Sequence, residues 1–166
     1  ANMAFESCFD IIGPVMVGPS SSHTAGAVSI GRFVHEWLDG CPEKAEITLY
    51  GSFAQTYQGH GTDKALIGGL VGMDTEDVRI KHAFDVARQQ NLTFSFHLED
   101  RCPYVDHPNT AVISAKKGAV SAKVGGMSIG GGLSSIFLLN DRDVDIHLGT
   151  NADLAAICER MKTERR

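Results

Sequence analysis

Apolar residues recur at intervals of three and four over 24–38, which predicts an amphipathic helix that buries Ile30, Val34 and Leu38. Glycine and proline in Asp39-Gly40-Cys41-Pro42 mark the end of this helix. Similar spacing predicts further helices over 63–72, over 75–90 and from Asn151 to the end of the chain. The helix over 75–90 has Asp74-Thr75-Glu76-Asp77 as its expected cap.

Alternation of apolar and polar residues predicts the strands, most plainly where Phe94 and Phe96 alternate with Ser95 and His97. Strands are expected over 44–51, 92–98, 110–116, 119–124, 134–139 and 144–148. Lys116-Lys117-Gly118 reads as the turn of a hairpin. Mixed elements followed by consecutive strands predict an α+β fold with a mixed, largely antiparallel sheet packed with helices. We assign 1–150 to this domain and 151–166 to the start of a linker or helix.

Composition narrows the class of protein. The 166 residues are 43% apolar with a net charge of −5, which suits one globular domain and argues against a nucleic-acid partner. No apolar run approaches the ~20 residues of a membrane helix, and no signal peptide is visible. With Met3 as a candidate natural start, we expect a cytoplasmic protein. The four cysteines form no Cys-x-x-Cys pair, so we expect this chain to bind no metal itself.

Polar and titratable side chains are most concentrated in Gly18-Pro19-Ser20-Ser21-Ser22-His23-Thr24-Ala25-Gly26, directly before the first long helix. Serine and threonine are preferred N-cap residues, but four polar side chains exceed what one cap needs. The start of a helix carries partial positive charge and free N–H donors, so it suits an anion. We therefore predict a carboxylate or phosphate cradle that contains a titratable histidine. The structural alternative is a helix cap that carries more polar side chains than capping needs and binds no ligand.

A second segment, Gly59-His60-Gly61-Thr62-Asp63, repeats this arrangement of imidazole, loop and helix start. Thr62 is a suitable N-cap, and Asp63 opposes the helix dipole in the first turn. His60 between two glycines leaves room for a ligand. The alternative is a turn that happens to contain a histidine.

Two later segments complete the candidate site. His107-Pro108-Asn109-Thr110 lies in a loop before a strand, and we treat His107 as a loop residue that the structure must check. Ser128-Ile129-Gly130-Gly131-Gly132 predicts a tight bend, either with N–H groups that bind an anion or as a bulged strand end.

These segments resemble, in order, motifs of the β domain of bacterial iron–sulfur-dependent L-serine dehydratase. They are Phe9-Asp10-Ile11-Ile12-Gly13-Pro14, Gly18 to Thr24, Tyr50-Gly51-Ser52-Phe53, Gly59 to Asp63, His107 to Thr110 and Ser128 to Gly132. Asn151-Ala152-Asp153-Leu154 is similar to the link into the α domain of single-chain members. We therefore expect the N-terminal fragment of a one-chain enzyme, with a separate β subunit as the alternative.

The resemblance implies an L-serine ammonia-lyase, which converts L-serine to pyruvate and ammonia in amino-acid degradation and gluconeogenesis. It implies a 4Fe-4S cluster on an α domain outside this chain, a homodimer, and an inactive fragment. His60 and His23 are the candidate bases, and the sequence leaves the choice open with a preference for His60. The expected substrate-binding residues are Ser20, Ser21, Ser22, Thr24, Thr62, Asn109, Gly130 and Gly131.

Three other functions compete with this one. The resemblance extends to the allosteric substrate-binding domain of some phosphoglycerate dehydrogenases, so a non-catalytic serine- or anion-binding module is the main alternative. A structural role, in which strand edges pair with a partner, is the second. A phosphate-handling enzyme is the third, and the absence of a Gly-x-x-x-x-Gly-Lys-Ser/Thr loop argues against it.

Overall fold

The computed structural model describes residues 22–58, 61–150 and 152–164, and six strands form one sheet in this part of the chain. The strand order is β2-β1-β3-β4-β5-β6, with β1 and β2 parallel and the other neighbours antiparallel. The strands are β1 Lys44–Gly51, β2 Thr93–Glu99, β3 Asn109–Lys117, β4 Val120–Gly130, β5 Leu133–Leu139 and β6 Arg142–Leu148. The predicted α+β fold with a mixed, largely antiparallel sheet is confirmed.

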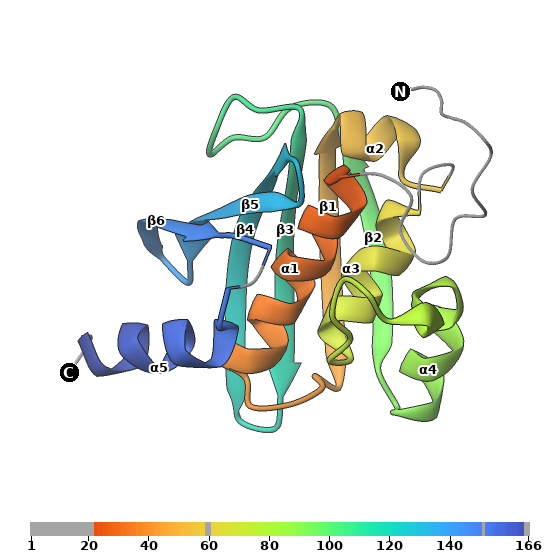
Figure 1. Cartoon of the computed structure of the whole chain (residues 1–166), viewed down its shortest axis with the longest axis vertical. Coiled ribbons are helices and arrows are strands. Elements are labelled where there is room, and N and C mark those ends of the chain that lie inside the picture. Colours follow the sequence, from red (N-terminus) through yellow and green to blue (C-terminus); the bar gives the residue numbers. More distant parts are fainter. Residues whose placement is uncertain (1–21, 59–60, 151, 165–166) are drawn as a thin grey trace.

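Helices cover one face of the sheet, with α1 lying across its centre (Figure 1). The helices are α1 Ser22–Trp37, α2 Ser52–Thr56, α3 Thr62–Leu70, the 3-10 helix η1 Val78–His82, α4 Ala83–Gln89 and α5 Leu154–Glu164. The core lies between these layers, and its fully buried members include Ile30 and Phe33 of α1, Ile47 of β1 and Ile113 of β3. None of the described helices has the length and hydropathy needed to cross a membrane.

The two central helices, α1 and α3, run in the same direction and touch through glycines. A Cβ added to Gly69 would lie 2.2 Å from the Val28 carbonyl oxygen, and one added to Gly31 would lie 2.3 Å from that of Leu66. At one end of the pair Gly61 lies next to Thr24, and at the other His35 Nδ1 lies 2.9 Å from the Leu70 carbonyl oxygen. Because the helices are parallel, their N-terminal ends lie together.

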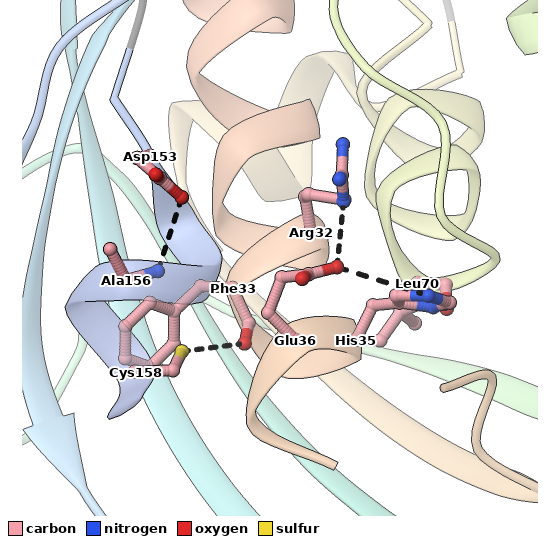
Figure 2. Close-up of polar contacts among 8 residues, drawn as sticks. All are labelled: Arg32, Phe33, His35, Glu36, Leu70, Asp153, Ala156 and Cys158. Carbon is pink, nitrogen blue, oxygen red and sulfur yellow. Dashed lines mark hydrogen bonds and ion pairs between the residues drawn. The ribbon is translucent and has the colours of Figure 1, made fainter. Parts of the chain in front are cut away.

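The C-terminal half of α1 is held from both sides (Figure 2). His35 contacts the end of α3, and Arg32 donates to Glu36 across one turn at 3.1 Å. On the other side Cys158 of α5 lies 3.8 Å from the Phe33 carbonyl oxygen, and burial raises the pKa of this thiol to about 12. These contacts fix where the opposite end of α1 lies.

Several predicted boundaries were wrong. Instead of one helix over 75–90, the chain forms η1 and then α4, because the Asp77 side chain accepts from the Arg79 N–H and starts a tighter 3-10 turn. Gly61, not Thr62, is the N-cap of α3, and its φ of 75° is a left-handed conformation that glycine adopts without strain. The last helix begins at Leu154. The short α2 was not predicted.

Candidate functional site

Chain segments that are far apart in sequence meet where several central strands of the sheet begin or end. Strand β1 ends at Gly51, which pairs with Asn109 at the start of β3, and Ser128 near the end of β4 pairs with Ser134 of β5. The N-terminal end of α1 lies over the same strand ends, as the contacts of His23 with Asn109 and Ser128 show. Antiparallel pairing therefore brings the start of β3 and the end of β4 under the start of a helix.

His23 is the centre of this cluster. Its Nδ1 lies 3.0 Å from the Ser128 hydroxyl oxygen and 3.4 Å from the Asn109 side-chain nitrogen. The imidazole is half-buried, whereas Ser128 is 0% exposed. Two polar partners on one ring nitrogen restrict how the imidazole can turn. Among the described residues, no hydrogen bond to Nε2 is found.

Ser128 reaches His23 because both neighbouring elements make room for it. The β4–β5 register shifts between Ser128 and Gly130, which is a β-bulge of the kind that redirects a side chain. On the helix side, a Cβ added to Gly26 would lie 2.6 Å from the Ser128 hydroxyl oxygen. Gly26 is the last residue of the segment 18–26. Because it has no side chain, there is space for the hydroxyl of Ser128, from the segment 128–132.

The loop that carries Asn109 is tied down by its own hydrogen bonds. The Asn109 backbone N–H donates to His107 Nδ1 at 3.1 Å, and the Thr110 hydroxyl donates to the His107 carbonyl oxygen at 2.8 Å. The Ser52 N–H donates to the Pro108 carbonyl oxygen at 2.7 Å. Burial, and to a smaller extent the charge of His23, lower the pKa of His107. A cavity of about 470 Å³ adjoins this loop, lined by residues 100–108 and Gly51.

The start of α3 forms the neighbouring wall. A Cβ added to Gly61 would lie 3.9 Å from the Thr24 methyl group. Thr24 and Thr62 are only 1% and 2% exposed, so they form the inner part of this wall. Asp63 is also buried, and burial raises the pKa of its carboxyl group although the Lys64 N–H donates to it at 2.7 Å.

The β4–β5 turn adjoins this cluster. Gly130, Gly131 and Gly132 have φ values of 98°, 64° and 76°, which confirms the predicted tight bend. The register shift before Gly130 matches the bulged strand end that the sequence left open as one alternative. A Cβ added to Gly132 would lie 4.0 Å from the Ala25 Cβ, so the turn lies beside the first turn of α1.

The structure therefore brings together some of the predicted site residues. His23, Thr24, Asn109 and Thr62 lie around the paired helix starts, with Gly130 and Gly131 in the adjoining turn. Ser20, Ser21 and His60 lie outside the described residues, as does the side chain of Ser22.

Sequence reasoning did not assign Ser128 to the site and treated His107 as an ordinary loop residue. The only sequence signal for Ser128 was its place before three glycines, which does not reveal the direction of its side chain.

Metal ligands are not assembled within the part of the chain that the structure describes. No group of three or more His, Cys, Asp or Glu side chains there is placed to hold a metal ion. Cys41, Cys102 and Cys158 are free thiols. The described residues thus do not fit an iron–sulfur cluster.

The chain belongs to the serine dehydratase beta chain family, whose pattern it matches over residues 7–136. It is 50% identical over 138 residues to a Bacillus subtilis protein named "Probable L-serine dehydratase, beta chain" and 41% identical over 142 residues to the L-serine dehydratase beta chain of Peptoniphilus asaccharolyticus. Each alignment covers 83% of this chain and 62% of the relative. The chain thus spans about three fifths of the length of these relatives.

A Helicobacter pylori protein named L-serine dehydratase is 30% identical over 149 residues, which cover 78% of this chain and 32% of that relative. The two relatives of higher identity are thus the ones named as beta chains.

Proposed function

We propose that this chain is the β part of an L-serine dehydratase and supplies one half of a pocket that an iron–sulfur α part completes. The observation that carries this proposal is the meeting of its motif segments at one place, around the parallel starts of α1 and α3. Parallel helices direct two positive dipole ends toward the same region, which favours a bound carboxylate. The names of the beta-chain relatives favour an α part on a separate chain.

The proposed role of this chain is to bind and orient L-serine and to move its α-proton. Ser20, Ser21, Ser22 and Thr24, with N–H groups at the start of α1, hold the substrate carboxylate. Thr62, Asn109, Gly130 and Gly131 shape the same pocket. His60 or His23 accepts the α-proton, a step for which a positioned base contributes about 10²–10⁴-fold in rate.

The 4Fe-4S cluster is assigned to the α part, and no step proposed for this chain passes through it. The described residues of the β part act by hydrogen bonding, by charge and by shape, and His23 among them is one of the two candidates for the proton transfer. The proposal includes a cytoplasmic location and a homodimer of the β part, and analytical ultracentrifugation tests the second.

The experiment is to purify this chain together with the matching iron–sulfur α part and to measure pyruvate formation from L-serine. The complex should be active and this chain alone inactive. His60→Ala should lower kcat much more than it raises KM, and Ser21→Ala should raise KM. His97→Ala is the matched control, since His97 is exposed on the edge strand β2 and should leave both constants unchanged.

The result also separates the enzyme from the binding-module alternative. A complex that forms but makes no pyruvate, while this chain alone binds L-serine, would support the non-catalytic module and contradict the proposal.

A further inference from the structure

The contacts at His23 bear on which of its ring nitrogens carries the proton in the neutral form. A ring with its proton on Nδ1 offers a basic Nε2, whereas a ring with its proton on Nε2 offers a hydrogen-bond donor there. We propose that Ser128 and Asn109 hold neutral His23 with its proton on Nε2, so that His23 donates a hydrogen bond to a carboxylate or carbonyl oxygen of the ligand instead of accepting a proton. This inference deepens the proposed function and rests on it only for the identity of the ligand.

The chemistry of the two partners decides the assignment. The Asn109 amide turns its nitrogen, which can only donate, toward His23 Nδ1 at 3.4 Å, and this orientation matches a lone pair on Nδ1. The Ser128 hydroxyl can donate or accept, and at 3.0 Å it satisfies the same lone pair by donating. Both contacts are favourable only when Nδ1 is unprotonated. The proton of the neutral ring then resides on Nε2.

The surroundings keep this arrangement rigid. Ser128 is 0% exposed, so no solvent competes for its hydroxyl, and Gly26 leaves the space in which that hydroxyl meets the ring. The Asn109 backbone N–H, which can only donate, points to His107 Nδ1 at 3.1 Å, so neutral His107 also carries its proton on Nε2. Burial lowers the pKa of His107, which favours the uncharged form of this ring next to His23.

The consequence is a division of roles between the two candidate histidines. His23 binds and orients an anionic group at the start of α1, in line with the dipole of that helix. The α-proton is then left to His60, the residue that the sequence reasoning preferred. Ser128 is a positioning residue, because it acts on the ligand only through His23.

The test is a long-range ¹H–¹⁵N spectrum of the imidazoles of this chain at neutral pH, without substrate. Wild-type His23 should show a protonated Nε2 and an unprotonated Nδ1. Ser128→Ala removes the closer of the two partners and leaves only the 3.4 Å contact from Asn109, so the fraction of His23 protonated on Nδ1 should rise. Ser121→Ala, at an exposed serine on the same strand, should leave the spectrum of His23 unchanged. Asn109→Asp replaces a donor by an acceptor, so it should move the proton to Nδ1 or protonate the ring. Backbone amide spectra of each variant confirm that it is folded.

Activity of the assembled enzyme supplies the second measurement. Ser128→Ala should raise the KM for L-serine by about two- to tenfold, the value of one hydrogen bond, with little change in kcat. A wild-type ring protonated on Nδ1, or a large loss of kcat at constant KM, would overturn the inference. Loss of serine binding with the Nε2 proton in place would instead count against the proposed function alone.

Discussion

The contact between α1 and α3 gives the most direct test of the structure, through two neighbouring glycines of α3. A Cβ at Gly69 would lie 2.2 Å from the Val28 carbonyl oxygen and 2.5 Å from the Arg32 nitrogen, both backbone atoms of α1. A Cβ at Gly68 would meet only side-chain atoms, the Met73 sulfur at 3.3 Å, the Ile80 side chain at 3.5 Å and the Ala83 Cβ at 3.8 Å. Gly69→Ala must therefore push two helices apart, whereas Gly68→Ala needs only a small shift of a flexible side chain.

The expected magnitudes follow from these distances. Overpacking costs about 1–3 kcal/mol or more, and a helix gap of roughly 1 Å forfeits up to half of the dispersion energy at the contact. Replacing glycine by alanine within a helix returns about 1 kcal/mol. We expect Gly69→Ala to lower the free energy of unfolding by about 2 kcal/mol, which lowers Tm by about 4–8 °C. Gly68→Ala should be neutral or stabilising by up to about 1 kcal/mol.

The assay is urea unfolding followed by circular dichroism and by fluorescence of Trp37, which is 7% exposed. The slope of unfolding free energy against urea concentration should stay the same in both variants, so that the midpoint reports stability. Equal stability of the two variants, or a stabilising Gly69→Ala, would show that α1 and α3 do not pack through this contact.

Three further predictions concern single titratable groups. Because burial lowers the pKa of His107, the unfolded chain binds more protons, so stability should fall as pH drops below about 6.5, and His107→Gln should remove this part of the pH dependence of unfolding. Burial raises the pKa of Asp63, so Asp63→Asn should stabilise the protein at pH 7, with the gain fading as pH falls toward 4 in the same unfolding assay. With its pKa at about 12, buried Cys158 should resist iodoacetamide at pH 8 while half-buried Cys102 reacts, as mass spectrometry of peptides would show.

The periodicity of the sequence was sufficient for most elements of the fold. The helix over 24–38 and the strand over 44–51 appear as α1 and β1 within two residues, because long amphipathic patterns have one stable arrangement against a core. The segment over 75–90 was less informative. There the Asp77 side chain accepts a hydrogen bond from the Arg79 backbone N–H and competes with the α-helical hydrogen bonds. The chain therefore forms the short η1 before α4.

The candidate site, like the fold, could be predicted from the sequence only in part. The sequence by itself determined which short segments carry histidine, serine, asparagine and glycine at helix and strand ends, because cap and turn preferences are local. Only the tertiary structure decided that Ser128 and Asn109 meet at one nitrogen of His23, that Gly26 admits the Ser128 hydroxyl, and that α1 and α3 start side by side. These contacts depend on strand register and on helix packing between residues that are far apart in the sequence, which no local pattern encodes.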